Sequence, residues 1–265
     1  MEIIEHIEEP VISIKNLKKN YGMNLVLNGI DLTVNKGQII GYIGPNGAGK
    51  STTVKIMLGL EEDYQGEIKI FGDNIAKGNV DYKRRIGYVP EIAELYDNLT
   101  AQEYLTFIGE MYGLDRAEAD EKALRLMRVF GLDENYYSRI SSFSKGMKQK
   151  VLIISSLLHN PDLLFLDEPI GGLDANSVMV FKEILAQLAA QGKTIFYSSH
   201  IMEVVEKISS RIILLNEGRV IADGSFEELK SKNKEGTLEE IFNQLTGFDE
   251  HKQLAEEFVA IVQGG

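Results

Sequence analysis

The stretch Gly44-Pro45-Asn46-Gly47-Ala48-Gly49-Lys50-Ser51-Thr52 carries the clearest chemistry in this sequence. It fits the pattern G-x-x-x-x-G-K-[ST], in which small residues let backbone N–H groups close around phosphate oxygens. We expect Lys50 to reach the β- and γ-phosphates of a nucleoside triphosphate and Ser51 to ligate Mg²⁺. The alternative is a glycine-rich turn with a chance Lys-Ser. An apolar run before the loop and a helical pattern after it favour the phosphate-binding interpretation.

Paired carboxylates close a second apolar run, Leu163 to Leu166, which is too short for a helix. A buried strand that ends in two acids suits a parallel sheet, because ligands bind beyond the carboxyl ends of such strands. We expect Asp167 to hold Mg²⁺, directly or through water, and Glu168 to accept a proton from the attacking water. The alternative is an acidic N-cap before a turn.

A histidine ends a third run of this kind, Lys193 to Ser199. The strand end places His200 with the two carboxylates, where it can bond the γ-phosphate or orient water. A lone histidine is otherwise structural. His6, His159 and His251 lack this context and are expected on the surface.

Two further segments suit a nucleotide. Ser144, Lys145 and Gly146 open a predicted helix that runs toward residue 159, and a helix N-terminus attracts anions. A serine N-cap is often only a cap, so that alternative stays open. Tyr21 is placed in the turn after the first strand, where an aromatic ring can stack on adenine or can simply be a turn residue.

These residues need a framework of strands and helices to bring them together. Short apolar or alternating runs predict strands, and a capping box at Thr100 and Glu103 opens the first of two successive helices. The predicted fold is α/β, with a P-loop NTPase (RecA-like) core, an antiparallel β subdomain and an inserted helical subdomain at about 92–160. Strands are expected at 11–14, 25–27, 30–34, 66–72, 86–91, 163–167 and 193–200, followed by a hairpin over 211–221 and two helices.

Composition excludes several classes of protein. The chain of 265 residues can bury a full core, as one large domain or two subdomains. Without cysteine it has no disulfide, thiolate metal site or cysteine nucleophile. A net charge of -12 argues against a nucleic-acid partner. The acidic start does not look like a secretory signal, and no apolar run approaches the roughly 20 residues of a membrane span. We therefore expect a cytosolic chain, or one held on the membrane by another protein.

The order of the motifs resembles that of the ATP-binding subunit of an ATP-binding cassette (ABC) transporter, over residues 11 to about 230. The resemblance implies that two such domains pack head to tail. The signature residues Ser144, Lys145 and Gly146 of one would then cap the γ-phosphate held by the Walker A loop of the other. The matched positions are Tyr21 for the adenine-stacking aromatic, Gly44 to Thr52 for Walker A, Asp167 and Glu168 for Walker B, Leu173-Asp174 for the D-loop and His200 for the switch histidine.

Two departures from the family pattern stand out. Phe143-Ser144-Lys145-Gly146-Met147 replaces the usual Leu-Ser-Gly-Gly-Gln, and Glu91 replaces the glutamine expected after Val89-Pro90. Glu91 adds negative charge near Mg²⁺, where it either binds the metal or serves the transmission of movement to a membrane partner. Both variants are similar to those of bacterial ABC-2-type exporters.

The resemblance implies an ATPase subunit that uses ATP and Mg²⁺ and forms a dimer with a second copy or a related subunit. It would drive a separate integral membrane permease, in export, from the cytoplasmic face of the cell membrane. The surface that docks on the permease is expected near Glu91 to Asn98. The ATPase domain is expected at 11–230, followed by a helical tail at 231–265. The alternatives are a soluble ABC-type ATPase of an assembly complex, as in iron-sulfur cluster biogenesis, and a module that binds ATP without hydrolysing it.

Overall fold

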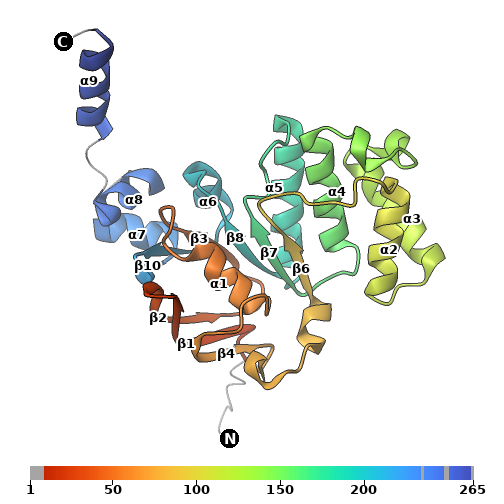
Figure 1. Ribbon diagram of the computed structural model, residues 1–265, viewed down its shortest axis with the longest axis horizontal. Coiled ribbons are helices and arrows are strands. Elements are labelled where there is room, and N and C mark those ends of the chain that lie inside the picture. The colour runs from red at the N-terminus through yellow and green to blue at the C-terminus, as the bar shows by residue number, and fades with distance from the viewer. Residues whose placement is uncertain (1–8, 234–235, 248–250, 264–265) are drawn as a thin grey trace, which may run out of the picture.

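A six-stranded sheet forms the centre of the molecule in a computed structural model, which describes residues 9–233, 236–247 and 251–263 (Figure 1). The strand order is β10-β9-β3-β8-β7-β6, and all neighbours are parallel except β9 and β10. The carboxyl ends of the five parallel strands therefore meet at one edge. The strands are β3 (Ile39–Ile43), β6 (Ile86–Val89), β7 (Leu163–Asp167), β8 (Thr194–Ser198), β9 (Arg211–Asn216) and β10 (Arg219–Gly224).

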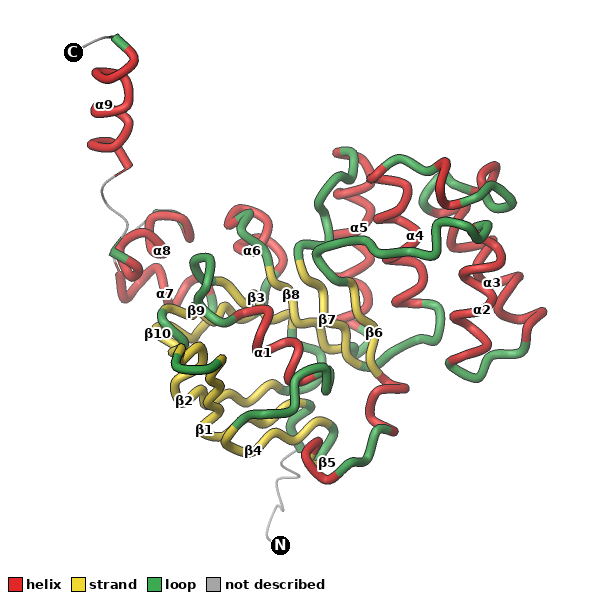
Figure 2. Tube along the Cα trace, viewed as in Figure 1, coloured by secondary structure: helices red, strands yellow, loops and turns green. Residues whose placement is uncertain are grey.

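A separate antiparallel sheet has the order β2-β1-β4-β5, as predicted (Figure 2). Its strands are β1 (Ile12–Tyr21), β2 (Asn24–Val34), β4 (Gln65–Ile70) and β5 (Asp73–Asn74). Two details of the prediction were wrong. The runs at 25–27 and 30–34 form one strand, because β2 continues past Gly29 by pairing with β1 along its length. Tyr21 is the last residue of β1 and pairs with Asn24, so it does not lie in the turn.

Packing on both faces explains why the central strands are uniformly apolar. All residues of β3 are buried. Ile40 and Tyr42 belong to the core shared with α1 (Lys50–Met57) and the antiparallel sheet, whereas Ile39 and Ile43 belong to the core shared with the other helices. Because both faces lack water, alternation of polar and apolar residues is absent here. The second core also includes α5 (Ala175–Ala190) and α6 (Met202–Ile208).

The predicted succession of helices follows β6. These are α2 (Ala101–Met111), α3 (Arg116–Val129) and α4 (Lys145–Leu157), which lie together beyond the β6 edge of the sheet (Figure 1). The capping box that opens α2 is confirmed: the Glu103 N–H donates to Thr100 Oγ1 at 3.1 Å, and the Thr100 N–H donates to Glu103 Oε2 at 2.8 Å. The helix is thereby fixed at its first turn.

Three helices end the chain: α7 (Phe226–Asn233), α8 (Leu238–Thr246) and α9 (His251–Val262). Leu229, Leu238 and Ile241 are buried in the same core as Ile39 and Ile43, so α7 and α8 pack on the body that contains the central sheet. Figure 1 shows α9 standing away from that body. Within the described ranges, no helix combines the length and apolar character needed to cross a bilayer.

His159 is half-buried and packed against its neighbours, whereas the prediction placed it on the surface. Its ring stacks on that of Tyr112 with centroids 3.6 Å apart, and its Nε2 lies 3.0 Å from the carbonyl oxygen of Ile86. Burial lowers the pKa of His159, and Lys122 and Lys193 add to that effect. His6 and the side chain of His251 lie outside the described residues.

Candidate nucleotide-binding site

The loop before α1 is shaped by its lysine and its last glycine. Lys50 Nζ donates to the carbonyl oxygens of Gly44 at 2.7 Å and Pro45 at 3.2 Å. Gly49 has φ 102°, a left-handed conformation that only glycine adopts readily, and a β-carbon there would strike the Leu27 side chain. No side chain caps α1, so its first N–H groups remain available to an anion.

The carboxyl ends of neighbouring strands bring the predicted polar residues together at this loop. Asp167 pairs in register with Ser198, so β7 and β8 end side by side. Ser51 Oγ lies 3.4 Å from Asp167 Oδ2. The strand β6 stops at Val89, whereas the prediction extended it to Glu91. Glu91 therefore lies just beyond the strand end.

These residues line one cleft of about 340 Å³. Three residues of the predicted loop, Gly44, Pro45 and Ala48, do not line the cleft and stabilise the loop instead. The carbonyl oxygens of Gly44 and Pro45 accept from Lys50, and the buried Ala48 donates its N–H to the Pro45 carbonyl oxygen. The lining residues are Tyr21, Asn24, Val26, Asn46, Gly47, Gly49, Lys50, Ser51, Thr52, Glu91, Asp167, Glu168, Ser198 and His200.

Glu168 is held by the residues that follow β8. Its Oε1 accepts from the His200 N–H at 2.8 Å and lies 2.8 Å from His200 Nδ1. Its Oε2 accepts from Ser199 Oγ at 3.0 Å. The backbone of Glu168 has φ 47°, an uncommon conformation for a residue with a side chain. His200 therefore lies with Glu168 at the strand ends, and its contact in this structure is with that carboxylate.

Charge in the cleft is dominated by carboxylates. Burial lowers the pKa of Lys50, although Glu168, Asp167 and Glu91 oppose this shift. Burial raises the pKa of Asp167, and the charges of Glu91 and Glu168 act in the same direction, whereas Ser198 and Ser51 oppose it. Three carboxylates therefore surround one ammonium group, and this excess of negative charge favours a bound cation.

The chemistry of the donor set fits magnesium with a nucleotide. Mg²⁺ prefers oxygen ligands and is usually held by one or two side chains together with substrate phosphates. Ser51 and Asp167 provide a hydroxyl and a carboxylate at the cleft wall, with Glu91 beside them. No group of three or more His, Cys, Asp or Glu side chains in the described ranges forms a complete metal site. Bound there, Mg²⁺ would neutralise charge on the phosphates.

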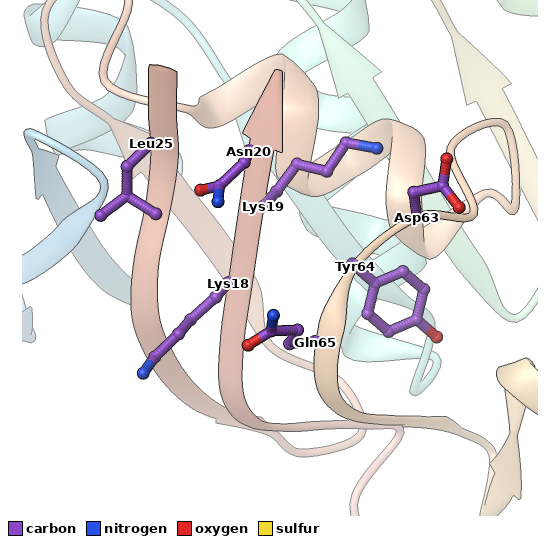
Figure 3. Close-up of a pocket in the computed structure, with 7 residues that line it drawn as sticks. All are labelled: Lys18, Lys19, Asn20, Leu25, Asp63, Tyr64 and Gln65. Atoms are coloured by element: carbon purple, nitrogen blue, oxygen red, sulfur yellow. The ribbon is translucent and has the colours of Figure 1, made fainter. Parts of the chain in front are cut away.

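Tyr21 lies at the rim of the cleft, with 44% of its surface exposed. Lys19 Nζ lies 4.9 Å from the centre of its ring and 3.1 Å from Glu61 Oε2. A neighbouring hollow on the antiparallel sheet shares none of the cleft's lining residues (Figure 3). Its lining residues are Lys18, Lys19, Asn20, Leu25, Asp63, Tyr64 and Gln65.

The predicted second anion site does not line this cleft. Ser144 caps α4 by accepting from the Met147 N–H at 3.2 Å, and both Ser144 and Lys145 are exposed. The same end of α4 is joined to the segment after Glu168: Gln149 Nε2 donates to the Pro169 carbonyl oxygen at 2.9 Å. Lys150 forms an ion pair with Asp174 at 3.2 Å.

Four residues at or behind the cleft were not predicted as site residues. Asn24 and Val26 come from β2, and Ser198 and Ser199 end the strand before His200. The alternation of β2 and the two serines beside His200 were visible in the sequence. Their positions near the carboxylates depend on strand pairing, which the sequence leaves open.

Comparison with known proteins identifies the family. The family described as "ABC transporter" matches residues 27–171. This chain belongs to the ATP-binding subunits of ABC transporters. It is 40% identical to the linearmycin resistance ATP-binding protein LnrL of Bacillus subtilis, over 84% of this chain and 71% of LnrL. The bacitracin transport ATP-binding protein BcrA of Bacillus licheniformis is 36% identical, over 84% and 72%. The Nod factor export ATP-binding protein I of Burkholderia lata is 32% identical, over 93% and 84%.

Solved structures agree with this ABC ATPase assignment. An ATP-binding subunit of an ABC transporter superimposes with a TM-score of 0.84 and 36% identity, over 89% of this chain and 99% of the other. A dimeric ATP-binding cassette in a post-hydrolysis state, bound to ADP and Pi, gives 0.75 and 26%, over 81% and 98%. The predicted P-loop NTPase fold is thereby confirmed. As a member of this family, the chain is an ATPase that binds ATP with Mg²⁺, dimerises and pairs with a membrane permease. The comparisons do not support the alternative of a soluble assembly ATPase.

Proposed function

We propose that this ABC ATPase subunit powers an exporter and that Glu168 is the general base of its ATP hydrolysis. The observation that carries the catalytic assignment is the meeting of Glu168, Asp167 and Lys50 in one cleft at the strand ends. Lys50 and the loop Gly44 to Thr52 hold the phosphates, and Tyr21 stacks on adenine. Ser51, Asp167 and Glu91 are the magnesium ligands.

His200 has two successive partners in this proposal. It contacts Glu168 in the present structure and moves to the γ-phosphate when nucleotide is bound. Its side chain is 80% exposed, so the surrounding protein does not restrain such a rotation. A γ-phosphate, which carries more negative charge than a single carboxylate, would offer an imidazole N–H a stronger acceptor.

The signature residues act on the nucleotide of the partner subunit. Ser144, Lys145 and Gly146 lie outside the chain's own cleft, and the first two are exposed at an N-terminal helix end. That placement suits contact in trans, since the free N–H groups of the first turn point away from the body of α4. The partner is a second copy or a related subunit.

The permease binds beside α2, at the cytoplasmic face of the membrane. A groove there exposes Tyr96 and Phe107, at 62% and 44%, next to Ile92 at 68%. Exposed aromatic and aliphatic side chains of this kind are typical of protein interfaces. Export is supported by relatives whose names refer to bacitracin transport and Nod factor export. The groove is lined by Leu95, Tyr96, Asp97, Asn98, Leu99 and Phe107.

The domain division remains part of the proposal. Residues 11–230 form the ATPase domain, 92–160 its helical subdomain and 231–265 the tail. Residue 230 lies inside α7, and the Leu238 N–H of α8 donates to Glu206 at 3.0 Å, so the first part of the tail packs as an extension of the ATPase domain.

The test combines turnover with capture of the partner. Glu168→Gln should abolish ATP hydrolysis while it preserves ATP binding, because the amide keeps the shape of the side chain but cannot take a proton. The variant, held in ATP, should retain a polytopic membrane protein from detergent-solubilised cells. Normal turnover would overturn the assignment of the base, and recovery of soluble proteins alone would favour an assembly ATPase.

A further inference from the structure

Both oxygens of the Glu168 carboxylate are occupied, and by different groups. Oε1 faces His200, through its N–H and its Nδ1, each at 2.8 Å. Oε2 accepts from the hydroxyl of Ser199 at 3.0 Å. If His200 turns to a phosphate, its Nδ1 leaves Oε1 while the Ser199 bond is unaffected.

The hydroxyl oxygen of Ser199 makes a second contact, with the backbone of Ile201. Ser199 Oγ accepts from the Ile201 N–H at 3.2 Å, and the residue is only 1% exposed. A serine hydroxyl has a single proton to donate. The Ile201 N–H occupies a lone pair of Ser199 Oγ and leaves the hydroxyl proton for Glu168 Oε2.

Ser199 does not reach the nucleotide cleft itself. Ser198 and His200 line the cleft, whereas Ser199 between them points behind it toward Glu168. The Glu168 backbone, at φ 47°, is additionally tied to β8 by its N–H, which donates to the Ser198 carbonyl oxygen at 2.9 Å. The Ser199 hydroxyl completes this attachment at the side-chain end.

We infer that Ser199 is a positioning residue for ATP hydrolysis: its buried hydroxyl holds Oε2 and so helps to fix the orientation of the Glu168 carboxylate at the cleft. This inference rests on the proposed role of Glu168 as the base. Without the hydroxyl, Oε2 loses its donor, and the carboxylate is held at Oε1 alone by the His200 N–H. Its terminal bond, which has a broad preference, is then less restrained. Misorientation of a catalytic group slows the chemical step, whereas nucleotide binding does not depend on it.

The experiment compares three substitutions at Ser199. Ser199→Ala and Ser199→Cys should each lower kcat by about tenfold, since a hydrogen bond to a charged group is lost or becomes weak. The KM for ATP should stay within about twofold, because Ser199 does not touch the nucleotide. Ser199→Thr keeps the hydroxyl and should restore most of kcat; the Cys variant tests the same point without added carbon if threonine is too large.

Two controls separate positioning from loss of structure. Ser209→Ala should leave kcat unchanged, because the buried Ser209 hydroxyl has no partner among the described residues. In a Glu168→Gln background, Ser199→Ala should not change the amount of dimer formed in ATP.

Each failure has a distinct meaning. A wild-type kcat in Ser199→Ala, a parallel rise in KM, or loss of the ATP-bound dimer would overturn the role of Ser199. Failure of Glu168→Gln to abolish turnover would instead overturn the assignment of the base, on which Ser199 depends.

Discussion

Gly146, in the first turn of α4, lies against Gly172 so closely that a β-carbon on Gly146 would sit 2.5 Å from the Gly172 carbonyl oxygen. The signature helix and the segment that follows Glu168 are therefore in direct backbone contact. Gln149 and Lys150 add a hydrogen bond and an ion pair to the same segment. Movement of the segment after Glu168 would therefore be passed to the N-terminal end of α4, which we propose contacts the partner's nucleotide.

Gly146→Ala should force α4 and this segment apart. Overpacking of this kind costs about 1 to 3 kcal/mol, because backbone atoms cannot move aside as a flexible side chain can. Urea unfolding should report the loss of stability. Gly171→Ala is the matched control, since its β-carbon would lie 3.4 Å from the Glu168 carbonyl oxygen, an ordinary contact. Equal stability of the two variants would contradict the close approach.

Lys50→Ala should weaken ATP binding by about tenfold to a hundredfold, the worth of hydrogen bonds to a charged group. The lysine already lies over the loop, donating to the Gly44 and Pro45 carbonyl oxygens. Titration with a fluorescent ATP analogue measures the loss. Lys55→Ala, on an exposed position of α1, removes the same charge from the same helix and should bind normally.

His159 predicts a loss of stability in mild acid. Burial lowers its pKa in the folded state, so the unfolded chain binds a proton first as the pH falls below about 6.5. The stability supplied by the neutral ring is present above that pH and is lost as the pH falls toward the folded pKa. His159→Gln should lose less stability than the wild type between about pH 7.5 and about pH 5, by urea unfolding. Identical losses would show that the ring is not buried as a neutral group.

Local sequence patterns account for the elements of the site whose place in the chain was predicted correctly. The loop Gly44 to Thr52 and the strand ending at Asp167 are each specified by adjacent residues. The environments of Ser199 and His159 could not be predicted in this way. They arise from contacts with Glu168 and Tyr112, which are far away in sequence. The length of β2 likewise depended on pairing with β1 across Gly29. Contacts between distant segments are the part that local pattern does not contain.

Lys145 predicts a salt-dependent dimer. It adds a positive charge at the N-terminal end of α4, which we propose contacts the partner's nucleotide, at a position where the family signature usually has glycine. In a Glu168→Gln background, Lys145→Gln should weaken ATP-dependent dimerisation several-fold at about 50 mM salt and much less at about 500 mM, where screening is strong. Lys148→Gln is the control, since Lys148 is paired with Asp97 at 2.7 Å. An equal effect of the two substitutions on sedimentation would contradict a specific role for Lys145.

Substitutions in the groove beside α2 should weaken binding of the permease without changing basal ATP hydrolysis. Tyr96→Ser with Phe107→Ser should reduce capture of the permease, because about 25 cal/mol of binding energy is lost for each Å² of apolar surface that is no longer buried. Basal ATP hydrolysis should be unchanged, since neither residue lines the nucleotide cleft. Met179→Ser removes an apolar side chain that is even more exposed, at 69%, from α5 and should leave capture intact. Loss of capture in the α5 variant alone would move the docking surface away from the groove and onto α5.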